Sequence, residues 1–406
     1  MRALVLGRGG REHALCWSLA AGGAEVFALP GSDGIAQVAQ CVPGDPNDAV
    51  QVADAVRRLG IGLVVPGPEE PLVRGIAEDL RAQGVPVFGP DRRGAQIEAS
   101  KAYAKTLMRA AGIPTASASL CQDFGAVEQT LAVHPDRTVV KADGLAAGKG
   151  VIVAEDASGA RRAARRLLAQ HGSVLLEERL RGPEASLIAL CHGRDYRLLP
   201  FARDHKRLLR GDLGPNTGGM GAFAPVDDVP ISAEECAERT IAPLLALLAE
   251  RGTPYSGALY AGLILTERGP MVLEYNVRFG DPETEAILPA LSGSVLPWLE
   301  GAAAGALPAE TPRVTRHALA VVLAAAGYPE TPEAGVAIAG LDGNPAAGAL
   351  VFHAGTRRED GAWRTAGGRV LCVVGQGADH AEARRAAYAA VAEIRFDGMQ
   401  VRDDIG

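Results

Sequence analysis

A segment of small residues that holds two lysines lies between two apolar runs at positions 139–153. The β-branched residues on either side predict a strand, a glycine-rich turn and a second strand. Glycines let backbone N–H groups approach phosphate oxygens, and lysines add positive charge. The residues concerned are Lys141, Gly144, Gly148, Lys149 and Gly150. The segment is therefore a candidate phosphate loop, with an ordinary β-turn as the alternative. It differs from the Gly-x4-Gly-Lys-Ser/Thr loop, because Gly150 follows Lys149 and a strand is expected next.

Lysine is scarce in this chain, which strengthens that interpretation. Only five of the 41 basic residues are lysine, and the others are arginine. The few lysines therefore indicate positions where a compact ammonium does what a guanidinium cannot. They are Lys101, Lys105, Lys141, Lys149 and Lys206. Asparagine is also scarce, with four in the chain, and two of them, Asn216 and Asn276, fall in the motifs described next.

A second candidate site lies at the end of the strand expected over 270–274. Along an extended strand Glu274 and Asn276 point to the same face, and Arg278 follows two residues later. A carboxylate and an amide oxygen suit a hard cation such as Mg2+, which also takes phosphate oxygens and water. The arginine would grip a transferred phosphate or an acyl carboxylate. A solvated polar strand end is the alternative.

Acidic residues end the strand expected over 173–178. This strand stops at Glu177 and Glu178, and a further carboxylate follows at Glu184. Such a segment could hold a nucleotide, with backbone groups at the adenine edge and a carboxylate on the ribose hydroxyls. Solvated carboxylates at a strand end are the alternative.

A glycine-rich stretch at 211–222 follows Asp204, His205 and Lys206. So many glycines in an irregular stretch indicate either a flexible surface loop or a tight anion nest. The nearby Lys206 and Asn216 favour the nest. No serine, cysteine or histidine nucleophile is needed for the chemistry expected below, and His205 is either a proton relay or structural.

The first hundred residues alternate strand and helix. A strand over 2–6 leads into Gly7-Arg8-Gly9-Gly10-Arg11-Glu12-His13 and a helical pattern, as in the first turn of a Rossmann-type unit. Glu12 stands where that fingerprint has its third glycine, and no acidic residue ends the second strand (26–29). A smaller phosphorylated ligand therefore fits better than a dinucleotide. With further strands at 62–66 and 85–89, residues 1 to about 95 are predicted to form a doubly wound α/β domain.

The remaining elements are expected by pattern as helices at 101–111, 157–170, 233–251 and 381–394, strands at 260–266, 318–325, 350–355 and 368–375, and a linker at 301–312. The strand at 260–266 carries Gly262 and no acidic residue. The part of the chain after the linker is predicted to be a small α+β domain without catalytic clusters.

Composition narrows the class of protein. A chain of 406 residues with 48% hydrophobic and 22% charged residues is long enough for two to four domains with real cores. No run approaches the roughly 18 apolar residues of a membrane span, and the chain starts directly with a strand, so we expect neither a membrane segment nor a signal peptide. Six scattered cysteines predict reduced thiols in the cytoplasm. A net charge of −7 without a basic tract argues against a nucleic-acid partner.

The motifs together resemble the ATP-grasp superfamily and, more narrowly, the phosphoribosylamine–glycine ligase family. The strings GGREHAL, KADGLAAGKGV, DHKR, GPNTGGMGA, RFGDPET, VFHAGT and GGRVLCV carry this resemblance, which runs nearly end to end. It implies an α/β and α+β multidomain fold with a Rossmann-like pre-ATP-grasp domain at 1–98. An ATP-grasp body at 99–305 with a mobile lid at about 115–182 and a small α+β domain at 313–406 would follow.

The resemblance also implies a reaction in purine biosynthesis. ATP, glycine and 5-phosphoribosylamine would give glycinamide ribonucleotide, ADP and phosphate through glycyl phosphate, with one to two Mg2+ or Mn2+ ions. Because phosphoribosylamine is labile, transient contact with neighbouring purine-pathway enzymes is a further expectation.

The residues that would act fall into groups. Those expected to bind ATP are Lys101, Lys141, Gly144, Gly148, Lys149, Gly150, Glu177, Glu178, Leu180 and Glu184. Those expected to bind phosphoribosylamine are Gly9, Gly10, Arg11, Glu12, Gly31, Pro68 and Glu69. Those expected to bind glycine or the phosphoryl group are Gly218, Gly219, Met220, Arg278 and Gly280. The expected catalytic residues are Asp204, Lys206, Asn216, Arg278 and Asp281, and the expected metal ligands are Glu274 and Asn276.

Three departures from the family pattern concern phosphoribosylamine affinity. Arg8 replaces a small polar residue, Ser32-Asp33 replaces an Asn-Ala pair, and Pro66 replaces an apolar residue. Three other functions stay open at this point. They are a nucleotide-dependent oxidoreductase using the Gly7–Gly10 turn, a non-catalytic ATP-binding regulator, and a different ATP-grasp ligase.

Overall fold

The computed structural model describes residues 1–145, 150–341, 343 and 349–406. Its first part is a four-stranded parallel sheet in the order β3-β2-β1-β4. The strands are β1 (Arg2–Gly7), β2 (Glu25–Pro30), β3 (Gln40–Cys41) and β4 (Leu63–Pro66). The accompanying helices are α1 (Gly10–Ala21), α2 (Ala49–Leu59), α3 (Glu69–Arg74), α4 (Ile76–Arg81) and α5 (Arg92–Ala99), with a short 3-10 helix at Ile35–Gln37.

The prediction of a strand at 85–89 is wrong. Val87 makes only an isolated bridge to Val64 of β4. Pro86 has no N–H to donate, which prevents a full ladder at this edge.

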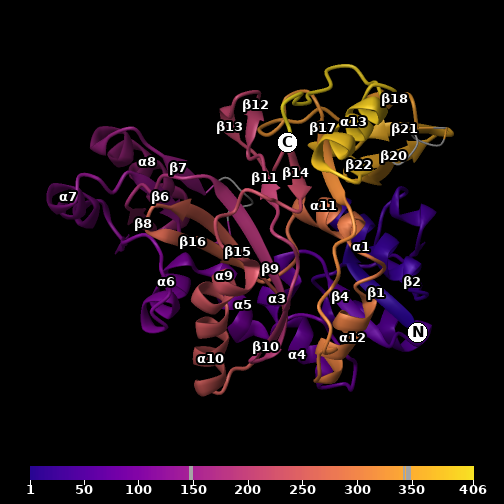
Figure 1. Ribbon diagram of the computed structural model, residues 1–406, viewed down its shortest axis with the longest axis horizontal. Helices are drawn as coiled ribbons and strands as arrows, with labels where there is room; N and C mark the ends of the chain where they lie inside the picture. Colours follow the sequence, from indigo (N-terminus) through magenta and orange to yellow (C-terminus); the bar gives the residue numbers. More distant parts are fainter. Residues whose placement is uncertain (146–149, 342, 344–348) are drawn as a thin grey trace.

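The lid expected at about 115–182 contains a four-stranded antiparallel sheet in the order β5-β8-β6-β7. Its strands and helices are β5 (Ala118–Cys121), α7 (Phe124–Val133), β6 (Val139–Ala142), β7 (Val151–Val153), α8 (Ala157–His171) and β8 (Val174–Glu177). Apolar side chains of the sheet and both helices form a separate core, and in Figure 1 this part projects from the rest of the molecule. The two strands predicted on either side of the glycine-rich segment are confirmed as β6 and β7, and residues 146–149 between them lie outside the described part of the chain.

The body is built on a second antiparallel sheet in the order β10-β9-β15-β16. Its strands are β9 (Glu184–Gly193), β10 (Asp195–Leu198), β15 (Tyr255–Thr266) and β16 (Gly269–Asn276). Its helices are α6 (Lys101–Ala110), α9 (Ala233–Thr240), α10 (Ala242–Glu250), α11 (Glu283–Ala290) and α12 (Leu296–Ala304). The single helix expected at 233–251 is two helices, because Pro243 starts α10. The expected linker at 301–312 begins inside α12.

A third sheet joins the body to the last hundred residues, in the order β11-β14-β17-β22-β19. Its strands are β11 (Arg203–Asp204), β14 (Gly221–Ala224), β17 (His317–Ala324), β19 (Ala349–His353) and β22 (Arg369–Gly377), and α13 (His380–Val391) packs on it. Beside it lie the hairpin β12 (Arg207–Leu209) and β13 (Leu213–Asn216) and a small sheet of β18 (Ala337–Ile338), β20 (Thr356–Glu359) and β21 (Ala362–Thr365). The strands that flank the glycine-rich stretch thus belong to the same sheet as the last part of the chain.

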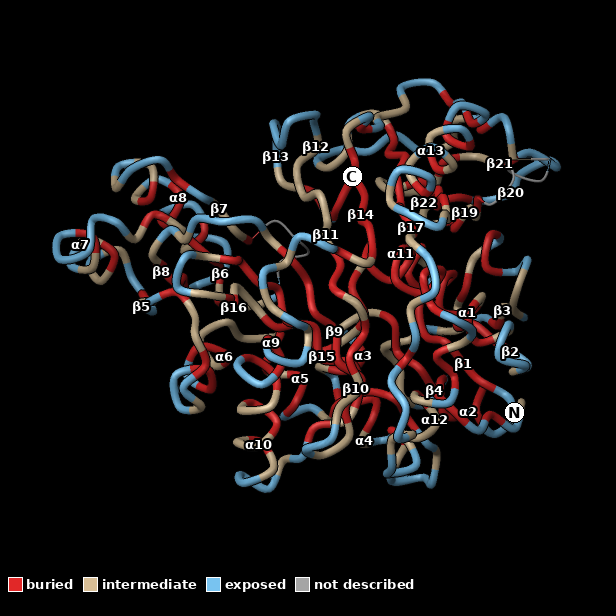
Figure 2. Tube along the Cα trace, in the orientation of Figure 1, coloured by how far each residue is buried: buried red, intermediate tan, exposed pale blue. Residues whose placement is uncertain are grey.

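Buried residues run through the middle of the parallel sheet, the body sheet and the sheet shared with the last part of the chain, whereas the lid helices and the hairpin tips are largely exposed (Figure 2). Among the described residues, no helix combines the length and apolar character needed to cross a bilayer. All six cysteines carry free thiols.

Candidate active site

Two lysines meet one carboxylate where the lid joins the body. The ammonium nitrogens of Lys105 and Lys141 lie 3.2 and 3.0 Å from Oε2 of Glu177, and all three side chains are buried. Burial lowers the pKa of Lys105 to about 8, although the charge of Glu177 opposes this shift. Among the described residues, Oε1 of Glu177 has no hydrogen-bond partner. The cluster holds two cations and one anion, and can therefore attract a further anion.

A β-bulge orients Lys141. The pairing of β15 with β16 changes register between Gly262 and Leu263, which leaves Leu273 as the extra residue. The carbonyl of Leu273 accepts a hydrogen bond from Nζ of Lys141 at 2.9 Å. The lid strand β6 is thereby tied to the strand that carries Glu274 and Asn276.

Lys101 lies away from this carboxylate. Its Nζ donates to the carbonyl of Gly144 at 3.1 Å, and the hydroxyl of Ser100, the N-cap of α6, donates to Asp143 at 3.1 Å. Lys101 therefore contacts the start of the candidate phosphate loop. Gly150 at the far end is buried, and the predicted residues Gly148 and Lys149 lie outside the described part of the chain. Lys105 was not predicted as a site residue, although the scarcity of lysine had singled it out.

The acidic residues Glu178 and Glu184, where the lid joins the body, contact different partners. The carboxylate of Glu178 accepts from Arg268 at 2.8 Å and from Ser117 at 3.0 Å. Leu180 lies in the half-exposed connection that follows. Glu184 begins β9 and accepts from Nζ of Lys206 at 2.6 Å. The structure thus brings the predicted residues Glu184 and Lys206 together, and it places Glu178 in an ion pair of its own.

The predicted metal ligands lie at the end of β16. Burial raises the pKa of Glu274, but the charges of Lys206, Lys141 and other cations more than offset it and keep the carboxyl ionised. The side-chain oxygen of Asn276 accepts from Arg278 at 3.2 Å. In the described part of the chain no three His, Cys, Asp or Glu side chains are grouped to hold a metal. One carboxylate and one amide oxygen nevertheless fit Mg2+, which takes few protein ligands when phosphates supply the rest.

Arg278 is held by carboxylates from the first part of the chain. Its Nη2 donates to Glu98 at 2.9 Å, and its Nε lies 3.3 Å from Glu69. Glu98 also accepts the backbone N–H of Val277 at 2.7 Å. Burial raises the pKa of Glu98 despite the charge of Arg278. The predicted residues Glu69 and Arg278 therefore meet, and Glu98, which sequence reasoning missed, fixes the guanidinium.

A buried polar cluster surrounds Asp204. Burial raises its pKa to about 7, the charge of Lys206 opposes this, and the charge of Glu283 adds to it. Oε1 of Glu283 accepts from the hydroxyl of Tyr260 at 2.8 Å and from that of Ser186 at 3.2 Å. Glu283 lies in the RFGDPET string, whereas Ser186 and Tyr260 lie on β9 and β15, and only the fold brings the three residues together. They leave Asp204 able to exchange a proton near neutral pH.

The N-terminus of α1 is capped by the carboxylate of Glu12, a residue of the same helix. Glu12 accepts the backbone N–H groups of Gly9 at 2.6 Å and Arg8 at 3.2 Å. It also lies 2.6 Å from Nε of Arg11, whose Nη1 donates to the carbonyl of Phe279 at 3.3 Å. The N–H groups of Arg8 and Gly9 therefore already have an acceptor within the protein, whereas the N-terminus of this helix was expected to bind a phosphate. Gly10 is buried at the start of α1, where a β-carbon would crowd Glu285.

The substituted loops have local structural roles. The hydroxyl of Ser32 accepts the N–H of Ile35 at 3.3 Å, and Asp33 accepts the N–H of Arg358 at 2.6 Å. Gly31 precedes them with a positive φ of 69° and donates to the carbonyl of Gly7. Pro66 ends β4, and Pro68 is the N-cap of α3, which begins at Glu69. Asp33 thus connects the first part of the chain to the last.

The expected anion nest is occupied by internal hydrogen bonds. The N–H of Gly218 donates to the hydroxyl of Tyr328, that of Gly219 to the hydroxyl of Thr217, and that of Met220 to the carbonyl of His205. In this structure the three amides donate within the protein, and the roles predicted for Gly218, Gly219 and Met220 in binding glycine or the phosphoryl group stay predictions. Asn216 ends β13, opposite Arg207. Burial lowers the pKa of His205 to about 4, which keeps its imidazole neutral.

The last part of the chain contributes an arginine to this region. Arg369 of β22 donates to the carbonyl of Gly218 at 2.7 Å and lies 2.8 Å from the carboxylate of Asp281. Burial raises the pKa of Glu285, and the nearby charge of Asp281 raises it further. Burial also acts to raise the pKa of Asp281, but the charges of Arg369 and Arg11, with smaller contributions from other neighbours, together lower it. Gly280, the residue before Asp281, is buried against Glu283. The last domain, whose sequence was expected to hold no catalytic-looking cluster of its own, thus contributes one arginine to a cluster of the body.

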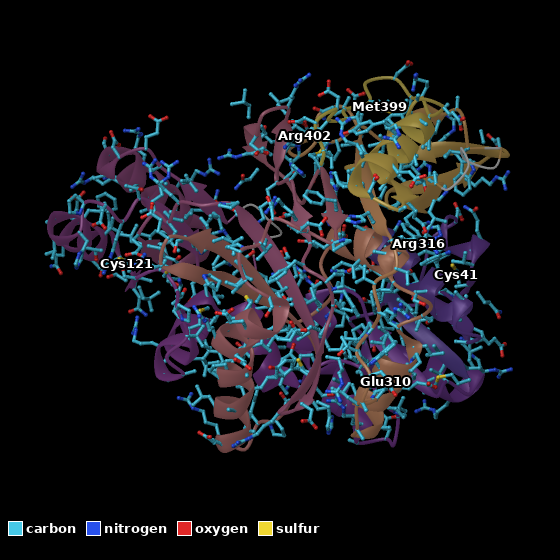
Figure 3. The ribbon with its side chains drawn as sticks, viewed as in Figure 1. Cys41, Cys121, Glu310, Arg316, Met399 and Arg402 are labelled. Carbon is cyan, nitrogen blue, oxygen red and sulfur yellow. The ribbon has the colours of Figure 1, made fainter. Side chains whose placement is uncertain are left out.

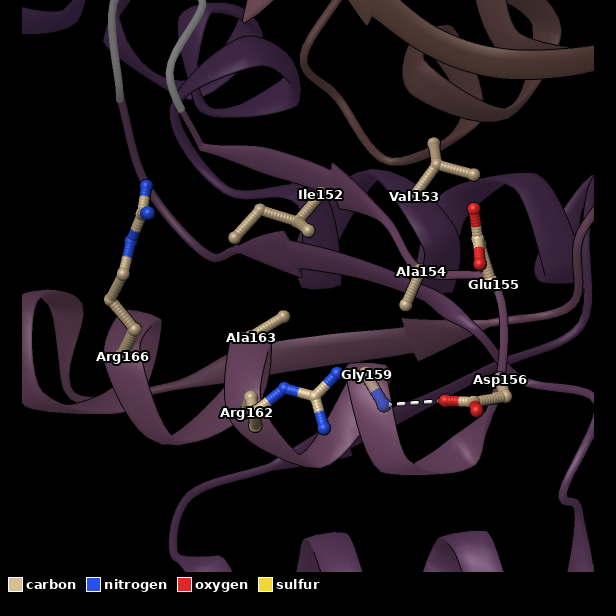
Figure 4. Close-up of a pocket in the computed structure, with 9 residues that line it drawn as sticks. All are labelled: Ile152, Val153, Ala154, Glu155, Asp156, Gly159, Arg162, Ala163 and Arg166. Carbon is tan, nitrogen blue, oxygen red and sulfur yellow. Dashed lines mark hydrogen bonds between the residues drawn. The ribbon is translucent and has the colours of Figure 1, made fainter.

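A groove of about 440 Å3 lies elsewhere, on the lid (Figure 4). It is lined by Ile152, Val153, Ala154, Glu155, Asp156, Gly159, Arg162, Ala163 and Arg166. None of the predicted site residues that the structure describes lines it. The candidate active site therefore consists of the polar clusters described above.

Three models of one protein family match the chain. They are the N domain of phosphoribosylglycinamide synthetase over residues 1–98, its ATP-grasp (A) domain over 99–284 and its C domain over 318–406. A phosphoribosylamine–glycine ligase from Streptomyces coelicolor is 47% identical and covers 100% of this chain and 98% of its own length. One from Leifsonia xyli is 46% identical and covers 100% and 99%.

Solved structures agree with this result. The crystal structure of phosphoribosylamine–glycine ligase from Thermotoga maritima superposes with a TM-score of 0.89 at 35% identity and covers 100% of both chains. The biotin carboxylase domain of the 2-oxoglutarate carboxylase from Hydrogenobacter thermophilus, solved with MgADP and bicarbonate, gives 0.75 at 17% identity over 98% and 91% of the two chains. The second likeness concerns the fold alone. The predicted ATP-grasp architecture is confirmed.

Proposed function

This chain belongs to the phosphoribosylglycinamide synthetase family, and from that premise we propose that it catalyses the ATP-dependent ligation of glycine to 5-phosphoribosylamine. The products are glycinamide ribonucleotide, ADP and phosphate, as in purine biosynthesis. The observation that supports this most directly is the position of Arg278. It lies between the candidate metal ligand Asn276 and the carboxylates Glu69 and Glu98 of the first domain. One arginine thus joins the nucleotide side of the site to the phosphoribosylamine side.

The lysine cluster would hold the ATP phosphates. Lys105 and Lys141 present two ammonium groups that share one oxygen of Glu177. Lys101 would steady the loop that starts at Gly144, with Lys149 closing over the phosphates. Glu274 and Asn276 would hold one or two Mg2+ or Mn2+ ions, which neutralise phosphate charge when bound. Positioning and charge neutralisation are the main demands of phosphoryl transfer.

The ligation itself would proceed through glycyl phosphate. A carboxylate oxygen of glycine forms a bond to the γ-phosphorus, and the bond from that phosphorus to ADP breaks. The amine of phosphoribosylamine then attacks the activated carbonyl, phosphate leaves, and the amine loses a proton. Arg278 would stabilise the transferred phosphoryl group. Asp204, with a pKa of about 7, is suited to hold the ammonium of glycine or to take up a proton.

The N-terminal loops would bind phosphoribosylamine. Glu69 and Arg11 face Arg278 and the carbonyl of Phe279, so a substrate at Gly9–Gly10 would lie within reach of the acyl group. The division into domains at 1–98, 99–305 and 313–406 and transient contact with neighbouring pathway enzymes remain part of this proposal. Closure of the lid would exclude water, which otherwise hydrolyses an acyl phosphate.

The test is ADP release from ATP and Mg2+ with glycine alone, with freshly generated phosphoribosylamine alone, and with both. We expect release only with both substrates, and we expect Asn276→Ala to lower it at least tenfold. Asn276→Ala leaves Lys206 and Glu184 unchanged, so the hydrogen bond between them should persist if the variant is correctly folded. Nucleotide binding without turnover would instead support a regulator, and release with another amine acceptor would indicate a different ligase.

A further inference from the structure

The hairpin of β12 and β13 connects Asp204–Lys206 to the 217–220 loop, the two stretches to which we assign substrate binding. Among the described residues, none of its side chains belongs to a buried apolar core. Leu209 and Leu213 are 51% and 64% exposed, and the tube at β12 and β13 is mostly exposed or intermediate (Figure 2). At its base the N–H of Thr217 donates to the carbonyl of Lys206 at 2.8 Å. An isolated hairpin is only marginally stable in water. Its position must therefore come from contacts with other elements.

Those contacts come from Arg402, whose side chain is only 2% exposed. Its Nη1 donates to the carbonyl of Arg207 at 3.1 Å and to the carboxylate of Asp212 at 2.8 Å. Its Nε and Nη2 donate to the two oxygens of Asp404, each at 2.8 Å. Asp404 in turn accepts the N–H of Gly211 at 2.8 Å. One guanidinium thus contacts both the first strand and the tip of the hairpin, and the label of Arg402 in Figure 3 stands beside this part of the molecule.

Residues 402–405 are themselves fixed to the third sheet. The hydroxyl of Tyr388 on α13 donates to the carbonyl of Arg402 and accepts the N–H of Ile405, both at 3.0 Å. Ile405 is fully buried against Gly221, where a β-carbon would crowd its side chain. Because α13 packs on β17 and β22, the hairpin is connected to a rigid layer of the molecule.

We propose that Arg402 is a positioning residue for ligation, which acts through the hairpin on Lys206 and on the 217–220 loop. Lys206 contacts Glu184 and lies 4.0 Å from Asp204, at the place assigned to glycine. Without the guanidinium, the hairpin would move about its base, and the Lys206 ammonium would lose its fixed position. The candidate ATP site at Lys105 and Lys141 lies on other elements and would keep its geometry. This inference rests on the proposed ligase function.

The experiment uses the full chain and four variants: Arg402→Gln, Arg402→Lys, Asp212→Asn and, as control, Arg210→Gln. Asn at 212 accommodates the left-handed φ of 55° at this position, and Asp212 is 68% exposed, so this variant should fold. Arg210 pairs with Asp403 at the same hairpin, but both side chains are exposed. Hydrogen exchange of residues 207–216 and glycine-dependent and ATP-dependent kinetics are measured for each.

We expect faster exchange across 207–216 in Arg402→Gln and Asp212→Asn, but not in Arg210→Gln. We expect kcat/KM for glycine to fall about tenfold in Arg402→Gln, the KM for ATP to stay within twofold, and Arg402→Lys to recover part of the loss. Unchanged exchange, or faster exchange with unchanged glycine kinetics, would overturn the proposal. If the wild-type chain ligates nothing, the proposed function fails, and the exchange data still decide whether Arg402 fixes the hairpin.

Discussion

The guanidinium of Arg369 lies 2.8 Å from the carboxylate of Asp281, although the two residues belong to different domains of the family. The same guanidinium donates to the carbonyl of Gly218. The last domain therefore helps to build the candidate active site. This relationship leads to the first of four predictions.

Arg369→Gln should leave Asp281 beside Glu285 without its cation. Since both partners of the pair are about one-fifth exposed, we expect the free energy of unfolding to fall by about 2 kcal/mol. We expect kcat/KM for phosphoribosylamine to fall about tenfold, with partial recovery in Arg369→Lys. Arg385→Gln, an exposed arginine on α13, is the control. Wild-type kinetics in Arg369→Gln would show that the last domain only supports the site.

The pH dependence of ATP use should report Lys105. Its pKa of about 8 means that the ammonium is charged below pH 8 and neutral above it. We therefore expect kcat/KM for ATP to fall as pH rises through about 8, since this parameter reports the free enzyme. Arg cannot lose its proton in this range, so Lys105→Arg should remove the fall. An identical profile in that variant would exclude Lys105 as its cause.

Asp204 should control the use of glycine with the opposite sign. A carboxyl with a pKa of about 7 is protonated at pH 6 and ionised at pH 8. We expect kcat/KM for glycine to rise over this range and to become flat in Asp204→Asn. Because the charge of Glu283 raises the pKa of Asp204, Glu283→Gln should move the midpoint to lower pH. A midpoint that stays in place would mean that another group titrates.

Asp33→Ala tests the substituted loop of the first domain. The variant removes the acceptor of the Arg358 N–H at 2.6 Å, so we expect the free energy of unfolding to fall by about 1 kcal/mol. The KM for phosphoribosylamine should stay within twofold, because the carboxylate is used in an interdomain contact. Denaturant unfolding and initial rates measure both effects. A large change in KM at unchanged stability would place Asp33 at the substrate.

Local features of this protein could be predicted from its sequence. The strands β6 and β7, the Ser100 cap of α6, and the placement of Glu274 and Asn276 on one strand follow from rules that act over two to four residues. Side-chain alternation and capping need no knowledge of the rest of the fold. The motif strings, read as a resemblance, also identified the family.

Only the tertiary structure decided which of these residues meet. Lys105 rather than Lys101 pairs with Glu177, Glu98 holds Arg278, and Arg369 reaches Asp281 from the last domain. Each pair joins elements far apart in the chain, so no periodicity or spacing encodes it. The N–H of Gly218 likewise donates to the hydroxyl of Tyr328, which is 110 residues away in the chain. Backbone N–H groups take acceptors that the packed chain offers, and this acceptor reaches Gly218 only once the chain has folded.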